Sequence, residues 1–140
     1  MREIGICREE IELKRKTRTI TVNHQQYVWW YTFHDNMASV IISPVHDKTA
    51  AITIQFANKS FPFQSDDTPI AIGYFPEYIT IEKDHEAECL KTLSPRMVNL
   101  ILNHVSADSF QCRNHIVYDA FDFIADMGYT VTDMKTGIYW

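Results

Sequence analysis

Alternation of apolar and polar residues runs through the first half of the chain and limits what it can fold into. In residues 18–22, Ile20 and Val22 point one way while Thr19 and Thr21 point the other. This period of two is typical of half-buried β-strands. Short runs rich in Asn, Asp and Pro separate the segments and favour tight turns. The sequence therefore predicts a meander of four antiparallel strands, and leaves open a further strand near residues 10–14. The four segments are RTITV, YVWWYTFH, SVIIS and AAITIQF.

The length of the first turn predicts which side of the aromatic segment faces the core. If residues 23–26 form a loop of two or four residues, facing residues on the two strands have position numbers with an odd sum. The odd-numbered aromatic residues then share the inner face with Ile20 and Val22. A second even-length loop adds Val40 and Ile42 to that face, whereas a three-residue first loop inverts the assignment. The aromatic residues expected inside are Tyr27, Trp29, Tyr31 and Phe33.

Trp30 is left on the opposite side of the predicted sheet, next to Ile41 and several threonines. A large aromatic side chain beside an aliphatic one on a polar face often marks a binding site for a partner or ligand. Burial under a second layer of the same chain, such as the C-terminal TGIYW, or in a dimer, explains the pair equally well. Trp30 is therefore a candidate hydrophobic anchor.

The second half of the chain changes character. After a long polar loop at residues 57–69, a hairpin is expected to turn at residues 83–86. Ser94 and Pro95 then provide a helix N-cap and a first-turn proline, and residues 114–128 show helical periodicity that ends at Gly128. We expect one α+β domain over residues 1–140, with an antiparallel β-meander or curved sheet in the N-terminal two thirds packed against two C-terminal α-helices.

The second predicted helix carries an acidic stripe. At about 100° per residue, His115, Asp119, Asp122 and Asp126 fall on one side of it, opposite the apolar residues, which include Val117. Aspartates three and four residues apart repel each other and are poor helix formers. A solvated polar face is the simplest interpretation. A basic protein partner, an intramolecular Lys or Arg, or a divalent cation would each offset the repulsion.

Composition limits the kinds of partner and the cellular compartment that we expect. The chain has 140 residues, of which 46% are hydrophobic, and a net charge of -5, so a core without disulfide or metal support is expected. The part of the chain after residue 18 has a net negative charge. This charge would repel the phosphate backbone, which argues against nucleic acid as a partner. Three cysteines without a CxxC pair fit reduced thiols. No apolar run approaches the about 20 residues that span a bilayer, so we expect a cytoplasmic protein without membrane contact.

Candidate catalytic residues are sparse. His34, His46 and His85 each follow or precede a carboxylate in the chain, but all lie in predicted turns, where adjacent side chains point apart. Cys112 and His115 have the spacing of half a zinc site, and the other half is missing. Phosphate-binding glycine motifs and the common hydrolase motifs are absent from the sequence. We therefore assign no catalytic residue, no metal ligand and no cofactor.

These observations favour a small non-enzymatic binding or accessory protein, of the inhibitor or immunity type, that engages a basic protein partner through acidic surface. The expected contact residues are Asp119, Asp122 and Asp126, with Trp30 as the hydrophobic anchor. One alternative is a small hydrolase or metal-dependent enzyme that brings a histidine and carboxylates together from different loops. The candidate histidines are His34, His46, His85 and His104. Another is an oligomer that sequesters a small ligand. Homo-oligomerisation stays open in each case.

Overall fold

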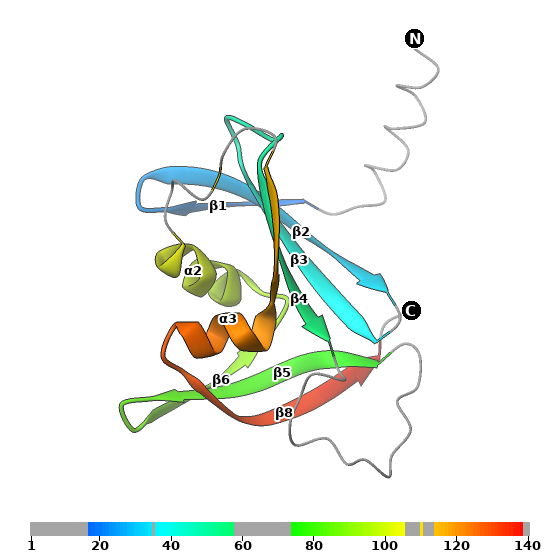
Figure 1. The fold of residues 1–140 in the computed structure, drawn as a ribbon, viewed down its shortest axis with the longest axis vertical. Coiled ribbons are helices and arrows are strands. Elements are labelled where there is room, and N and C mark those ends of the chain that lie inside the picture. The colour runs from blue at the N-terminus through cyan, green and yellow to red at the C-terminus, as the bar shows by residue number, and fades with distance from the viewer. Residues whose placement is uncertain (1–16, 35, 58–73, 106–109, 111–113, 139–140) are drawn as a thin grey trace.

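The structure is a computed structural model, and it describes residues 17–34, 36–57, 74–105, 110 and 114–138. Within these ranges the chain forms two β-sheets and two helices (Figure 1). The predicted α+β class, with an antiparallel meander and C-terminal helices, is confirmed. The predicted strand near residues 10–14, most of the loop at 57–69 and Cys112 lie outside the described residues.

Sheet A has the strand order β1-β2-β3-β4-β7, and its first four strands are the predicted meander. A two-residue turn at Asn23 and His24 joins the first two strands, with φ angles of 54° and 67°. This left-handed conformation matches the twist of the strands that the turn connects. Ile20 therefore faces Tyr27, an odd sum as predicted. The strands are β1 (Arg18–Val22), β2 (Gln25–His34), β3 (Met37–Pro44), β4 (Ala51–Ala57) and β7 (His115–Asp119).

The predicted inner face of β2 is confirmed. Tyr27 and Trp29 are buried, and Trp29 keeps only 1% of its surface exposed. Tyr31 is partly buried against the same core, and Phe33 contacts the ring of Phe75 from the other sheet at 5.0 Å between centroids. Val40 and Ile42 on β3 are fully buried. In the registers of β2 with β1 and with β3, the position numbers of facing residues have odd sums, which places the odd-numbered aromatic residues of β2 in the core.

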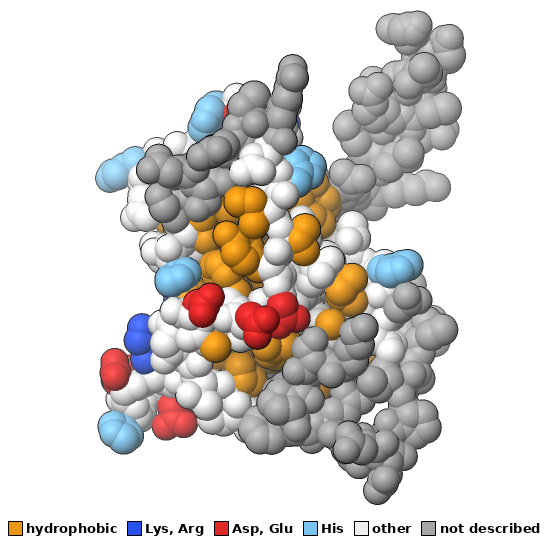
Figure 2. Space-filling model, in the orientation of Figure 1, with side chains coloured by type: hydrophobic (Ala, Val, Ile, Leu, Met, Phe, Trp, Pro, Cys, Tyr) orange, Lys and Arg blue, Asp and Glu red, His pale blue; other side chains and the backbone are white. Residues whose placement is uncertain are grey.

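The helix predicted over residues 114–128 is wrong in its first half. His115–Asp119 is strand β7, which pairs in parallel with β4, and only Ala120–Asp126 is helical (α3). Ile116 and Val117 are β-branched and suit a strand, and pairing with β4 decides the conformation. Helix α3 ends as predicted, because Gly128 has a φ of 92°. Figure 2 shows hydrophobic and acidic side chains gathered over this part of the fold.

Sheet B has the order β6-β5-β8 and lies across the open side of sheet A. Its hairpin turns at Asp84 and His85, inside the range predicted for it. The chain after α3 forms an antiparallel strand against β5, so residues 136–138 complete sheet B and do not form a layer over Trp30. The strands of sheet B are β5 (Tyr74–Lys83), β6 (Glu86–Lys91) and β8 (Thr130–Ile138).

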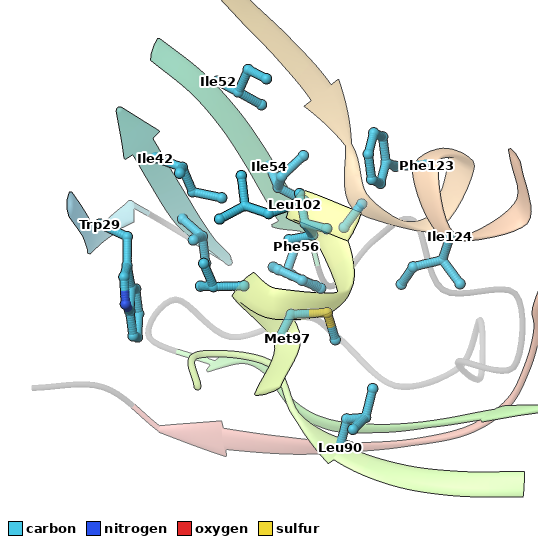
Figure 3. Packing of buried hydrophobic residues seen from close by; sticks show 14 of the residues in the cluster. Trp29, Ile42, Ile52, Ile54, Phe56, Leu90, Met97, Leu102, Phe123 and Ile124 are labelled. Atoms are coloured by element: carbon cyan, nitrogen blue, oxygen red, sulfur yellow. The ribbon is translucent and has the colours of Figure 1, made fainter. Parts of the chain in front are cut away.

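Helix α2 (Pro95–His104) fills the space between the two sheets. It starts as predicted, with the Ser94 hydroxyl accepting a hydrogen bond from the backbone N–H of Met97 at 3.2 Å. Figure 3 shows Met97 and Leu102 between the inner face of sheet A and Leu90 of β6. The inner face of sheet A is therefore closed by α2, α3 and sheet B, and its other side faces outward.

Candidate functional site

The outer face of sheet A, which is the side opposite the core, carries a row of side chains across four strands. Trp30 on β2 faces Ile41 on β3, Ile41 faces Thr53 on β4, and Thr53 faces Val117 on β7. Trp30, Ile41 and Thr53 are partly exposed, and Val117 is 58% exposed. We call these four residues the apolar row. It presents large hydrophobic side chains on a surface where the other strand positions are mostly polar or small.

The next row on the same face is polar. It runs from Thr32 through Ser39 and Gln55 to Asp119, in the same strand order. Asp119 follows Val117 by two residues, so both point outward from β7. Trp30 and Asp119, two residues that the sequence nominated separately, therefore lie on one face. They are about 16 Å apart, because three strand spacings and a step of two residues along the strand separate them.

The aspartates do not form the helical stripe that the sequence predicted. His115 belongs to β7, and Asp119 is the N-cap of α3, where its Oδ2 accepts a hydrogen bond from the backbone N–H of Asp122 at 3.1 Å. Asp122 lies in the first turn, where the helix dipole favours negative charge. The repulsion expected from a helical stripe is therefore offset at these two residues by the cap hydrogen bond and the helix dipole. Asp126, exposed in the last turn of α3, is the one aspartate in an unfavourable position.

A lysine offsets the negative end of α3. Lys83, at the end of β5, donates a hydrogen bond from Nζ to the backbone carbonyl of Met127 at 3.0 Å. The same ammonium lies 5.1 Å from the centre of the Tyr129 ring, a cation–π geometry. This contact stabilises the end of α3 close to Asp126. In Figure 2 acidic side chains gather over α3, next to hydrophobic side chains.

The structure places the four histidines of the enzyme alternative at separate positions. His34 ends β2, His46 follows β3, His85 lies in the β5–β6 turn and His104 ends α2, and all four are exposed. The ring of His104 packs edge-on against Phe123 at 5.4 Å between centroids. No group of three His, Cys, Asp or Glu side chains within the described ranges is arranged to hold a metal ion.

The sequence neighbours His46 and Asp47 each contact another residue. Nδ1 of His46 lies 3.0 Å from Nε2 of Gln25. The Asp47 carboxylate accepts hydrogen bonds from the hydroxyl and the backbone N–H of Thr49, which lower the pKa of Asp47 below its ordinary value. The contacts of Asp47 are typical of a local turn, in which the aspartate carboxylate accepts a hydrogen bond from the backbone N–H two residues later.

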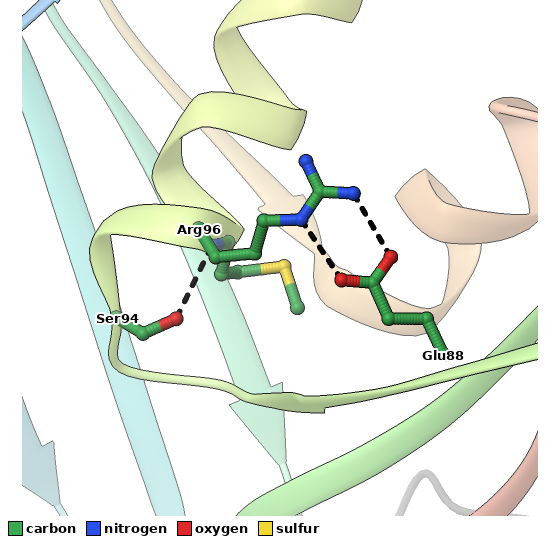
Figure 4. Close-up of polar contacts among 4 residues, drawn as sticks. Glu88, Ser94 and Arg96 are labelled. Carbon is green, nitrogen blue, oxygen red and sulfur yellow. Dashed lines mark hydrogen bonds and ion pairs between the residues drawn. The ribbon is translucent and has the colours of Figure 1, made fainter.

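A polar cavity of about 560 Å³ lies between the β5–β6 hairpin and the start of α2. Arg96 and Glu88 form one wall, joined by two hydrogen bonds of 2.9 Å from Nε and Nη2 (Figure 4). Arg96 lowers the pKa of Glu88, and the Glu88 carboxylate raises that of Arg96. Lys83 and Tyr129 also line the cavity. Both basic residues of the lining, Arg96 and Lys83, already have partners in the fold, and none of the expected contact residues lines the cavity.

Sequence reasoning missed Val117 as a surface residue. Its assignment to a helix placed it on the apolar side, toward the core, whereas in β7 it points outward. Two features of the sequence indicate the strand that exposes Val117. Ile116 and Val117 are both β-branched, which favours a strand. Asp119 is followed three residues later by the acidic Asp122, a spacing typical of a helix that begins at Asp119.

Within the described ranges, neither helix has the length and apolar character needed to cross a bilayer. Comparisons of the chain with protein-family models, with curated proteins and with solved structures found no match. The arguments for function therefore rest on the geometry of the outer face of sheet A.

Proposed function

We propose that this protein is a binding module that engages a basic protein partner through the outer face of sheet A and the acidic residues of α3. One observation supports the proposal above the others. The apolar row, with Val117 58% exposed, lies on the same face as Asp119 and ends where the acidic helix begins.

The apolar row supplies the attractive surface in this proposal. Trp30 is the largest side chain in the row, and tryptophan is enriched among residues that dominate interface energies. Burying apolar surface contributes about 25 cal/mol per Å² of area removed from water. Ile41 and Val117 extend the surface on both sides of Thr53. A flat apolar patch of this kind binds a partner side chain and governs how slowly the complex dissociates.

In this proposal, the negative charge of the aspartates selects partners that have a basic surface. Asp122 and Asp126 are exposed and one helical turn apart, and Asp119 adds its charge at the end of β7. A negative band beside an apolar patch attracts partners with basic surface and speeds their encounter, an effect that salt weakens. The same charge repels acidic proteins and phosphate backbones.

Affinity capture from a native lysate with three purified baits tests this proposal. The baits are the wild type, the Trp30→Ala variant and the Asp122→Asn, Asp126→Asn double variant. We expect the wild type to retain a protein with a net positive charge, and both variants to retain it at least about tenfold less, since charged and aromatic anchors each contribute more than 1 kcal/mol. Retention should also fall as salt is added.

The matched control is Asp133→Asn on β8 of sheet B, which removes one charge from a surface outside the proposed site. This variant should retain the partner as the wild type does. Asp119 is left unchanged because it caps α3. Equal retention by the wild type and both site variants, or equal loss in the Asp133 control, contradicts the proposal.

A further inference from the structure

The free edge of β7 has no partner strand among the described strands, because β7 ends sheet A and pairs only with β4. In the orientation of Figure 1 this strand runs along the front of the molecule. We propose that two copies of this chain join edge to edge through β7, antiparallel and related by a twofold axis that passes next to Val117. This inference goes beyond the proposed function and does not depend on it.

The direction of the backbone groups supports pairing at this edge. The backbone N–H of Ala51 on β4 donates to the carbonyl of Asn114 at 3.0 Å, and Ala51 faces His115. Backbone groups alternate in direction along a strand, so those of Ile116 and Tyr118 also point to β4. Those of His115 and Val117 and the N–H of Asp119 point to the open edge, whereas the carbonyl of Asp119, as the N-cap residue, accepts the first hydrogen bond of α3. The groups at the open edge are those that a second strand would pair with.

The residues of β7 are complementary to themselves when the strand is reversed. In the register centred on the twofold axis, Val117 faces Val117 of the second copy, and His115 faces its Asp119. All of these side chains lie on the outer face, where opposite charges and apolar pairs across strands are favourable. On the inner face, Ile116 meets Tyr118 of the second copy, and both residues are partly exposed in the single chain.

Other registers lose this match. A shift by one residue moves every side chain of the added strand to the opposite face. A shift by two residues in one direction places Asp119 opposite Val117 of the second copy, so the carboxylate meets an apolar side chain without a counter-charge. The centred register is therefore favoured. In this register both copies use the same residues, so the interface is isologous and has twofold symmetry.

The two edges of sheet B carry more features that discourage such pairing than β7 does. Charged side chains protect β6 through Glu88 and Lys91, and β8 combines Asp133 and Lys135 with two register irregularities. Charges and bulges of this kind are how proteins prevent unwanted edge contacts. The middle of β7 is apolar, with Ile116, Val117 and Tyr118 in succession.

Pairing at this edge leaves the outer face of sheet A open. The apolar row of one copy would continue into that of the other through the two Val117 side chains, because facing residues on antiparallel strands share a face. The edge contact and the proposed binding surface are therefore compatible.

Sedimentation equilibrium of the purified full chain at increasing concentration tests the dimer. We expect the wild type to dimerise with a measurable Kd. Val117→Lys places two like charges together on the axis and should raise the Kd on the order of tenfold or more. Thr21→Lys adds the same charge on β1, the opposite edge of sheet A, and should leave the Kd unchanged. Circular dichroism of each variant checks that it folds.

Two substitutions at His115 test the register. His115→Asp sets a carboxylate against Asp119 of the second copy, at two symmetry-related positions, and should raise the Kd about tenfold. His115→Lys places a positive charge opposite Asp119 of the second copy and should leave the Kd equal or lower it. A monomeric wild type at all concentrations overturns the proposal, as does a dimer that Val117→Lys leaves intact. Changes of the same sign in both His115 variants overturn the register. These measurements use the chain alone, so failure of the proposed partner binding does not affect their outcome.

Discussion

Replacement of Asp119 separates its hydrogen bond from its charge. Its Oδ2 accepts from the backbone N–H of Asp122 at 3.1 Å, and the charge lies at the positive end of the α3 dipole. Asp119→Ala removes both contributions, whereas Asp119→Asn keeps an oxygen in the same place and removes only the charge. An N-cap replaced by alanine costs about 1 kcal/mol, and asparagine caps about as well as aspartate. The dipole contribution is about 0.3 to 1 kcal/mol.

The expected free energies of unfolding follow directly. Asp119→Ala should be less stable than the wild type by about 1.3 to 2 kcal/mol, and Asp119→Asn by about 0.3 to 1 kcal/mol. For a chain of 140 residues, 1 kcal/mol corresponds to a shift in Tm of about 3 to 4 °C. Urea unfolding followed by circular dichroism gives the free energies, with equal m values as a check that the unfolded states are comparable.

The matched control is Asp126→Asn at the other end of α3. It removes a negative charge from the end where the dipole disfavours it, so it should be neutral or slightly stabilising, by about 0.3 kcal/mol. If Asp119→Ala unfolds at the wild-type urea midpoint, or if Asp119→Asn loses as much stability as Asp119→Ala, the capping interpretation is refuted.

Two further predictions concern the core and the surface. Trp29→Ala should cost about 3 to 5 kcal/mol in urea unfolding, because its side chain is 1% exposed, whereas Trp30→Ala on the outer face should cost clearly less; equal costs would contradict the register of β2. Because Arg96 holds the pKa of Glu88 below its ordinary value of 4.5, the ion pair stabilises the fold above that pH and its contribution is lost as the pH falls through the lower, folded-state value. The difference in urea midpoint between Glu88→Gln and the wild type should therefore shrink as the pH falls below 4.5, and a difference that stays constant with pH would oppose this account.

The N-terminal half of the fold could be predicted because its determinants are local. Alternation marks the strands, and a two-residue turn such as Asn23–His24 fixes the register of everything that follows it. The burial of Trp29 and the outward position of Trp30 follow from that register alone. Helix α2 was equally predictable, since Ser94 and Pro95 mark its start.

The region after residue 114 could be predicted only in part because distant contacts decide it. Ile116, Val117 and Phe121 fit a helical period as well as they fit a strand followed by a helix. The choice is made by β4, which lies far away in sequence and provides a parallel pairing edge. The site prediction carries the same error, because a helix over residues 114–128 puts the aspartates on one face and Val117 toward the core.

Strand β7 belongs to sheet A, while β6 before it and β8 after it belong to sheet B. The chain thus leaves sheet B after β6, adds β7 to sheet A, and returns to sheet B with β8. Such an order raises the contact order and delays the closing steps of folding, because residues far apart in sequence must meet. We expect the β1–β4 meander to form early and a growing chain on the ribosome to hold both sheets unfinished until β7 and β8 have emerged.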